Sequence, residues 1–260
     1  MDLGLAGKVA VITGGSMGIG KAAAVEFARE GASVVICARG AEALASAEAE
    51  IRAVAPGDVL SISADVRSPE DVATVVATTI ARFGRFDILV NNAGTAAGGR
   101  FESISDEAWD ADLDLKLMGA VRFSRYAIPH MRAAGGGRII NITHVGGKQP
   151  GAGSLPSSVS RAAGIALTKA MSKDLAADHI LVNTICVGTI KSAQIERAAT
   201  SRFPDLPLDQ AYERMATGIP LGRVGEAREV AALIAFLASP LGGFITGTAI
   251  NVDGGVSGAV

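Results

Sequence analysis

The chain has 260 residues, of which 49% are hydrophobic and 19% are charged, and its formal net charge at pH 7 is -2. This composition can build a large core and excludes a disordered chain, and the lack of any basic run argues against nucleic-acid binding. No stretch approaches the ~18 apolar residues of a membrane span, and Met1–Leu3 lacks the basic start of a signal peptide. We therefore expect a cytoplasmic protein.

Apolar runs alternate along the chain with longer stretches of helical periodicity. The expected strands are residues 9–13, 33–37, 59–64, 88–90, 138–142, 180–187 and 249–252. The expected helices are residues 21–30, 41–54, 69–83, 106–134, 157–177 and 226–238. Several strand runs are continuously apolar, as in strands that are buried on both faces. The alternation predicts one α/β domain over residues 1–260, a Rossmann-type doubly wound parallel sheet of about seven strands with helices on both faces.

One long stretch, residues 191–225, shows no regular pattern and contains Pro204, Pro207 and Pro220. Connections of this length are usually functional or disordered. We therefore expect an irregular segment that serves as a substrate lid.

The first expected strand runs directly into three glycines, Gly14, Gly18 and Gly20, after which a helical pattern begins. Glycine permits a tight turn and a close approach to a ligand, while a helix N-terminus offers free N–H groups and the positive end of the helix dipole. A glycine trio alone is weak evidence. Between a strand and a helix, at the start of a βαβ unit, it predicts a dinucleotide site.

The end of the second expected strand indicates which dinucleotide is preferred. A site for NAD places Asp or Glu roughly 20 residues beyond the glycines, where the carboxylate binds the ribose hydroxyls. This chain has Ala38 and then Arg39, and an arginine suits a 2′-phosphate instead. NADP(H) is therefore favoured over NAD(H). The alternative is that Arg39 is merely a solvated residue after a strand.

With Asn91-Asn92-Ala93-Gly94 after the fourth expected strand, the chain resembles the short-chain dehydrogenase/reductase family over nearly its whole length. T-G-G-S-M-G-I-G corresponds to that family's T-G-x-x-x-G-I-G turn, and A-D-V at residues 64–66 corresponds to its adenine-contacting position. The C-terminal segments P-L-G-R-V-G-E-A-R-E-V-A and V-D-G-G also match. The resemblance implies an NAD(P)(H)-dependent oxidoreductase for a carbonyl/alcohol pair, which assembles as a homotetramer.

Motifs and resemblance together give the expected cofactor-binding residues, and no metal site is expected. They are Gly14, Ser16, Gly18, Ile19, Gly20, Arg39, Asp65, Val66, Asn92, Ala93, Gly94, Arg161, Gly188 and Ile190.

The catalytic positions depart from the family pattern. The family uses a Tyr-x-x-x-Lys pair, a Ser thirteen residues before the Tyr, and an Asn on the preceding long helix. Here Ser157 stands at the tyrosine position and Arg161 at the lysine position, His144 replaces the serine, and Lys116 replaces the asparagine. Neither of the chain's two tyrosines is followed four residues later by lysine. The resemblance thus places four candidate catalytic residues where the usual tyrosine mechanism is not available.

Each candidate has a functional and a structural interpretation. Lys116 follows Asp112 by four residues, which allows an ordinary exposed ion pair, although the family fold points this position inward. His144 closes a strand, where it is either a structural histidine or an acid or base in a pocket. Arg161 can keep the lysine's charge but cannot donate a proton. Ser157 offers a hydroxyl, which is a poor acid when unassisted. We expect His144 or Lys116 to replace the tyrosine.

Three functions remain open: a reductase or dehydrogenase, a lyase, isomerase or hydratase with His144 as base, and a dinucleotide-binding protein without redox chemistry. One cleft is expected to hold several basic residues: Lys116, His144, Arg161 and, in a nearby loop, Lys148. Such cations repel one another, and an anion would relieve the repulsion. The sequence therefore predicts an anionic small-molecule substrate. Small residues in the helix at 157–177 and the apolar segment 249–260 favour a homo-oligomer.

Overall fold

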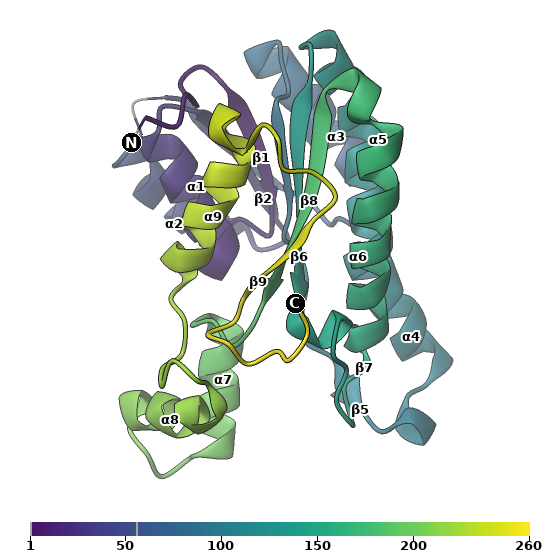
Figure 1. Cartoon of the computed structure of the whole chain (residues 1–260). Coiled ribbons are helices and arrows are strands. Elements are labelled where there is room, and N and C mark those ends of the chain that lie inside the picture. Colours follow the sequence, from purple (N-terminus) through teal and green to yellow (C-terminus); the bar gives the residue numbers. More distant parts are fainter. Residues whose placement is uncertain (1, 56) are drawn as a thin grey trace.

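The computed structural model describes residues 2–55 and 57–260 of the chain. Within these residues the main sheet has seven strands, all parallel, in the order β3-β2-β1-β4-β6-β8-β9 (Figure 1). Their bounds are β1 Val9–Thr13, β2 Ser33–Ala38, β3 Val59–Ser63, β4 Ile88–Asn91, β6 Gly137–His144, β8 Ile180–Val187 and β9 Ala249–Val252. The strand order reverses between β1 and β4, and in open α/β sheets this point forms a ligand-binding crevice. The predicted Rossmann-type fold is confirmed.

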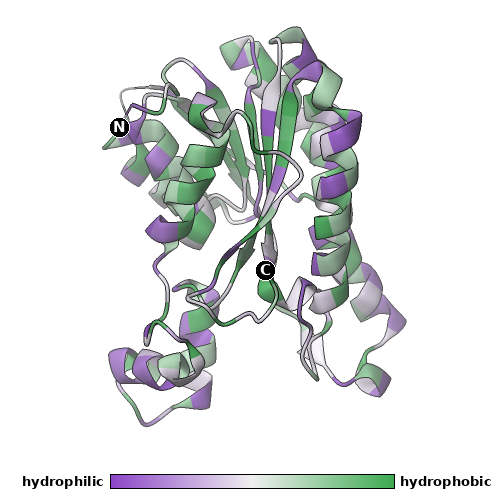
Figure 2. Ribbon diagram, viewed as in Figure 1, coloured by the Kyte–Doolittle hydropathy of each residue, from purple (hydrophilic) through white to green (hydrophobic). Residues whose placement is uncertain are grey.

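Helices cover both faces of the sheet (Figure 1). The hydrophobic cluster on one face includes residues of α1 (Gly18–Arg29), α2 (Ala41–Arg52) and α9 (Ala227–Ala238). The cluster on the other face includes residues of α3 (Pro69–Phe83), α5 (Gly119–Ala133) and the end of α6 (Ser157–Asp174). Figure 2 shows that the strands are largely hydrophobic, whereas hydrophilic residues gather on the outer helices.

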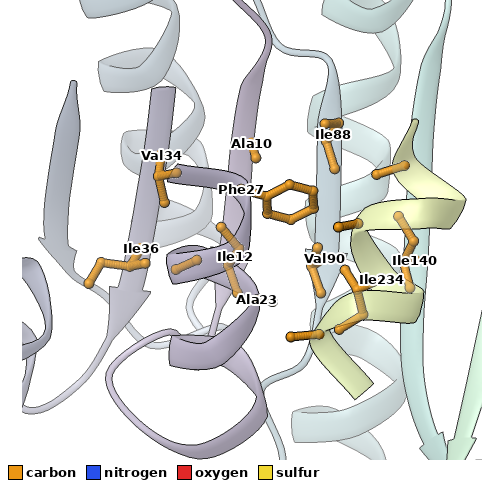
Figure 3. Packing of buried hydrophobic residues seen from close by; sticks show 14 of the residues in the cluster. Ala10, Ile12, Ala23, Phe27, Val34, Ile36, Ile88, Val90, Ile140 and Ile234 are labelled. Carbon is orange, nitrogen blue, oxygen red and sulfur yellow. The ribbon is translucent and has the colours of Figure 1, made fainter. Parts of the chain in front are cut away.

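The two clusters follow from the alternation of side chains along the strands. On β1, Ala10 and Ile12 face α1 and α9, where they pack with Phe27 and Ile234 (Figure 3). Val11 points to the opposite face and belongs to the second cluster. Every residue of β1 is buried, which explains why its sequence is apolar from Val9 to Ile12.

The expected helix at 106–134 is interrupted in the structure. It consists of α4 (Asp106–Leu113), a π-helical turn η2 (Asp114–Met118) and α5. Sequence periodicity did not reveal the π turn. Such turns insert an extra residue into a helix and are frequent at functional sites. Lys116 lies within this one.

The expectation of an irregular segment at 191–225 is wrong. This segment contains α7 (Ala193–Arg202) and α8 (Leu208–Met215). Pro204 lies between the two helices and Pro207 directly precedes α8, so these prolines end and begin helices without disrupting them. Both helices lie beyond the carboxyl ends of the strands (Figure 1).

Short elements complete the fold. An antiparallel pair that the sequence did not predict joins β5 (Gly98–Gly99) to β7 (Leu155–Pro156), immediately before α6. The 3₁₀ turns are η1 Phe101–Ser103, η3 Val145–Gly147, η4 Ala176–Asp178, η5 Ala216–Gly218 and η6 Pro240–Gly242. None of the helices that the described residues form is long and apolar enough to cross a membrane.

Candidate active site

The glycine turn between β1 and α1 has the conformation that a dinucleotide site requires. Gly14 and Gly18 have φ angles of 65° and 57°, in the left-handed region that favours glycine. The N–H groups of Gly14 and Gly15 donate to the Cys37 carbonyl oxygen and hold the turn against β2. Among the described residues no side chain caps α1, which begins at Gly18. Its first N–H groups are therefore available to a phosphate.

Gly20 allows the turn to approach β4 closely. A Cβ atom on Gly20 would overlap the Gly14 carbonyl oxygen and would lie 2.5 Å from Nδ2 of Asn92. That amide nitrogen donates to the carbonyl oxygens of Thr13 and Gly14, at 3.0 and 3.1 Å. Asn92 thus has a structural role in the turn. Its amide group ties the glycine turn to the end of β4.

Arg39 lies at the end of β2, where its side chain is exposed and forms no ion pair within the described part of the chain. Asp65, the expected adenine-side residue, forms a bidentate pair with Arg67, which sequence analysis did not single out. The hydrogen bonds from Arg67 lower the pKa of Asp65, and the charge of Arg39 acts in the same direction. Arg39 and Arg67 therefore both lie near the Asp65 carboxylate.

The other expected cofactor residues lie in the glycine turn or just beyond the carboxyl ends of the strands. Ser16 and Ile19 belong to the glycine turn and the first turn of α1, and Ala93 donates its N–H to Thr13 Oγ1 at 3.0 Å. Val66 and Ile190 are buried and pack below the surface. Gly188, after β8, has no room for a side chain, since a Cβ atom would lie 2.8 Å from Asp253.

Lys116 points into the protein and not toward solvent. Its side chain is 1% exposed and forms an ion pair with Asp112, whose side chain is 3% exposed. The exposed ion pair considered from the sequence thus exists in a buried form. Burial lowers the pKa of Lys116, the hydrogen bond to Asp112 opposes this shift, and the positive charge of Arg161 adds to the lowering.

Ser157, at the start of α6, forms hydrogen bonds with both members of this buried ion pair. Lys116 donates a hydrogen bond from Nζ to Ser157 Oγ at 2.5 Å, and the backbone N–H of Ala97 donates to the same oxygen at 3.0 Å. Ser157 Oγ donates to Asp112 at 3.3 Å. Ser160 donates to the other Asp112 oxygen at 2.6 Å. We call Asp112, Lys116, Ser157 and Ser160 the lysine–serine cluster. Asp112 and Ser160 were not among the predicted catalytic residues. Their helical spacing, four residues before Lys116 and three after Ser157, was a signal that could have identified them.

Arg161 lies between the lysine–serine cluster and the loop after β4. It lies one turn beyond Ser157 on α6 and donates from Nη1 to the carbonyl oxygen of Ile142 at 2.8 Å. A Cβ atom on Gly94 would lie 3.0 Å from its Nη2 atom. Among the described residues no carboxylate lies within ion-pair distance. Burial lowers the pKa of Arg161, yet an arginine remains charged.

His144 ends β6 with its side chain exposed. Its Nδ1 atom accepts a hydrogen bond from the Gly146 N–H at 2.9 Å, so the ring proton is on Nε2. The protein around the ring lowers the pKa of His144 by desolvation, and Arg161 adds to this, while Asp253 opposes it. At neutral pH His144 is therefore a neutral hydrogen-bond donor.

The expected group of free cations is not found. Asp112 neutralises Lys116, His144 is uncharged, and Lys148 points elsewhere. The Lys148 ammonium donates to the Ala249 carbonyl oxygen and to Asn251 Oδ1, both on β9, at 2.5 and 2.7 Å. Arg161 is the remaining cation of the predicted group.

A small cavity of about 10 Å³ lies behind the lysine–serine cluster. Its lining includes Lys116, Ser160, Arg161, Asn91 and Asn141. This volume is near the lower limit for a single water molecule. Asn91 Oδ1 is buried and has no hydrogen-bond partner among the described residues, as expected for a polar group that faces a water site.

Known proteins resemble this chain over nearly its whole length. The family profile described as enoyl-(acyl carrier protein) reductase matches residues 14–257. The 3-oxoacyl-(acyl-carrier-protein) reductase FabG of Thermotoga maritima is 35% identical over 252 residues, covering 97% of this chain and 98% of the relative.

Solved structures give the same result. L-sorbose reductase from Gluconobacter frateurii, in complex with NADPH and L-sorbose, superposes with a TM-score of 0.96 at 36% identity, covering 100% of both chains. A variant of actinorhodin polyketide ketoreductase with NADPH has a TM-score of 0.91 at 33% identity, covering 96% of this chain and 97% of the other. The chain belongs to the short-chain dehydrogenase/reductase family and is an oxidoreductase of that type.

Proposed function

We propose that the protein is an NADPH-dependent reductase that converts a ketone into an alcohol. The observation that carries the proposal is the position of Arg161. Its guanidinium lies against Gly94 on the cofactor side. One turn away on α6 lies Ser157, which contacts the buried Lys116 of η2. A hydride donor in the groove and a proton donor on α6 would thus meet at one substrate carbonyl.

The residues fit NADPH. The free N–H groups at the start of α1 suit the pyrophosphate, and the exposed Arg39 suits the 2′-phosphate. L-sorbose reductase and the actinorhodin ketoreductase both contain NADPH in their structures, which supports the preference. When bound, the cofactor supplies the hydride. Arg161 replaces the family's lysine as the cation near the nicotinamide ribose.

The alternative of a lyase or isomerase with His144 as base is disfavoured. A general base needs a free lone pair, whereas Nδ1 of His144 accepts from Gly146 and Nε2 carries the proton. The alternative of a dinucleotide-binding protein without redox chemistry is disfavoured by the similar proteins, which are reductases. The buried, charged lysine–serine cluster argues against it, because buried ion pairs are weak contributors to stability.

The net charge around the candidate site indicates whether the substrate is neutral or anionic. The sequence predicts an anionic substrate because it places several cations at one cleft. In the structure, however, Lys116 is paired with Asp112 and Lys148 binds β9. Only Arg161 still argues for an anion. We therefore propose a neutral hydroxyketone, the chemical class to which the L-sorbose in the similar reductase belongs.

We also propose that α7 and α8 act as the lid over this substrate. The segment begins beside the cofactor turn, where a Cβ atom on Gly18 would lie 3.4 Å from Ser192 Cβ. Gln194 Oε1 accepts from the backbone N–H of Ala96 at 3.0 Å, which ties α7 to the loop after β4. These contacts tie the start of α7 to both the cofactor turn and the loop after β4, which supports a lid at this position.

The test combines binding and turnover. NADPH fluorescence measures cofactor binding, and NADPH consumption is then followed with neutral hydroxyketones and, separately, with β-ketoacyl thioesters and keto acids. We expect tight NADPH binding and the highest kcat/KM with neutral compounds. Binding without turnover of any carbonyl would point to the non-redox alternative. A clear preference for anionic carbonyls would contradict the substrate proposal alone.

Finally, we propose a homotetramer. Met118, Tyr126 and Val159 expose apolar surface on η2, α5 and α6, and Val256 and Val260 do so at the C-terminus. Light scattering measures the assembly. Val159→Glu should reduce its mass, whereas Arg29→Glu on α1 should not. A monomeric wild type at micromolar concentration would contradict the proposal.

A further inference from the structure

We propose that Ser157 donates the proton to the substrate oxygen and that Lys116 returns a proton to Ser157, with Asp112 holding the ammonium in place. The inference rests on the proposed reductase function and names its acid. It replaces the expectation that His144 or Lys116 would act directly. It also makes the serine at the tyrosine position the residue that touches the substrate.

The geometry places the serine hydroxyl between the lysine and the substrate side. Lys116 is fully enclosed, with a side chain 1% exposed, so it cannot reach a substrate itself. Ser157 is only half-buried. Its oxygen accepts from Lys116 and from the Ala97 N–H, which uses both lone pairs. The hydroxyl proton is then free to leave, since its contact with Asp112 is long, at 3.3 Å.

The same hydrogen bonds make the serine a better acid. A hydroxyl alone is a poor acid because its conjugate base is an unstabilised alkoxide. Here an ammonium 2.5 Å away and a backbone N–H 3.0 Å away both point at the oxygen on which that charge would develop. This is the arrangement of an oxyanion hole, built around an enzyme oxygen, in surroundings from which water is largely excluded.

The substrate carbon receives the hydride, its C=O bond becomes a C–O single bond, and the oxygen takes the proton from Ser157. The Ser157 O–H bond breaks, and an N–H bond of Lys116 breaks to restore it. Lys116 is left neutral and regains a proton from solvent. The cavity lined by Lys116, Ser160 and Asn91 offers a place for the water that would carry it.

Two other residues could supply the proton, and the structure argues against both. Arg161 stays charged at every accessible pH and cannot donate. His144 is neutral and holds its one proton on Nε2. If it donated this proton it would become an imidazolate anion, which is far less stable than the neutral lysine that the Ser157 route leaves. His144 instead fits a residue that orients the substrate by donating a hydrogen bond.

The acidity of Lys116 is controlled by the charged groups that face it, Asp112 on α4 and Arg161 on α6. Burial and Arg161 lower the pKa of Lys116, and Asp112 raises it. Reduction requires the protonated lysine. The rate of reduction should therefore fall as the pH rises through a pKa lower than that of an ordinary lysine, about 10.4.

The first experiment compares neighbouring serines. Ser157→Ala should lower kcat about 10²–10⁴-fold with little change in NADPH affinity, and Ser157→Thr should restore much of the rate. Ser158→Ala is the matched control. Ser158 is the next residue of α6, but its hydroxyl has no partner among the described residues. If Ser157→Ala kept kcat within threefold while His144→Ala abolished turnover, His144 would be the acid and the proposal would be wrong.

The second experiment separates a relay from a structural role by the pH dependence of kcat. Lys116→Arg keeps the positive charge but cannot release a proton to Ser157, so kcat should be low and should no longer fall at high pH. Asp112→Asn should move this fall to lower pH. A fall at the same pH in wild type and Lys116→Arg would overturn the role of Lys116.

A third readout does not need turnover. In protein with carbon-13 at the lysine ε position, the Lys116 resonance, assigned by its loss in Lys116→Arg, gives the pKa directly, with and without NADPH. We expect a value below that of free lysine, which falls further in Ser157→Ala because the hydroxyl no longer accepts from the ammonium. An ordinary lysine pKa would overturn the relay even if the protein proved to be a reductase. A protein that bound no NADPH and turned over no carbonyl would instead refute the reductase function, and the relay with it.

Discussion

The Nζ atom of Lys116 lies 2.5 Å from the Oγ atom of Ser157, and the same ammonium pairs with Asp112 in a region from which solvent is excluded. The three residues come from a π turn, from the start of α6 and from α4. A charge pair in such a place is costly unless both partners are present, because neither can be solvated. Because each charge depends on its partner, the interaction between Lys116 and Asp112 can be measured by a double-mutant cycle.

We expect Lys116→Met and Asp112→Asn each to destabilise the protein, because each leaves the other charge buried without its partner. A typical cost for a broken buried pair is about 3–5 kcal/mol. The double variant Lys116→Met/Asp112→Asn should recover most of this loss. Urea unfolding of the four proteins, without cofactor, measures the coupling free energy.

The pair Arg122 and Asp114 provides the control for this cycle. It begins in the same π turn but is partly exposed, with side-chain exposures of 18% and 37%. Its coupling should be smaller, of the order of 1 kcal/mol or less. Equal coupling energies for both pairs would contradict the view that burial makes the Lys116 pair special.

The sequence predicted the sheet well because burial on both faces leaves a strong pattern. The largely buried runs at Val9–Thr13 and Ile180–Val187 have the bounds that the structure shows. The glycine turn was equally predictable, since the sequence patterns of the strand, the turn and the helix all fall within twelve residues, Val9 to Gly20. Local patterns of this kind depend little on the rest of the chain.

The catalytic arrangement was less predictable because it depends on contacts between distant residues. Lys116 and Ser157 are separated by 41 positions, and their contact requires the π turn, which has no pattern of its own. The helices in the segment 191–225 were missed for another reason. They are short and mainly polar, and the prolines around them suggested an irregular chain.

Arg39 provides a test of cofactor preference. Arg39→Ala should weaken NADPH binding about 10–100-fold, because a charge-assisted hydrogen bond to phosphate contributes about 1.5–3 kcal/mol, and should leave NADH binding nearly unchanged. Fluorescence titration with both cofactors measures this. Arg29→Ala, at an exposed site on α1, removes an arginine elsewhere and should change neither affinity. An equal loss for NADPH and NADH would contradict a role at the 2′-phosphate.

Gly20 provides a test of the glycine turn. In Gly20→Ala the new methyl group would overlap the Gly14 carbonyl oxygen and crowd the Asn92 amide, so the turn must open. We expect a loss of about 1–3 kcal/mol of stability, typical of overpacking, together with weaker NADPH binding. Gly151→Ala is the control, because a Cβ atom at Gly151 meets nothing within 4 Å and its φ angle is not positive. Unchanged stability and affinity in Gly20→Ala would show that the turn does not need the close approach.

His144 provides a test of protonation. Desolvation and the charge of Arg161 lower its pKa, so the folded protein favours the neutral ring. The unfolded chain has a histidine pKa of about 6.5. The stability that this preference provides is therefore present above about pH 6.5 and is lost as the pH falls, when the unfolded chain binds the proton more readily. Nitrogen-15 spectra of the three histidines, assigned with His144→Gln, should show His144 with its proton on Nε2 and a pKa below 6.5.

The charges around His144 set the direction of two further changes. Arg161→Met should raise the pKa of His144 because a repelling cation is removed, whereas Asp253→Asn should lower it because Asp253 favours the charged ring. Arg29→Met, on α1, should leave it unchanged. A His144 that titrated above 6.5, or that carried its proton on Nδ1, would mean that the Gly146 hydrogen bond does not fix the ring. His144 would then become available as a base, and the case against the lyase alternative would lose its main support.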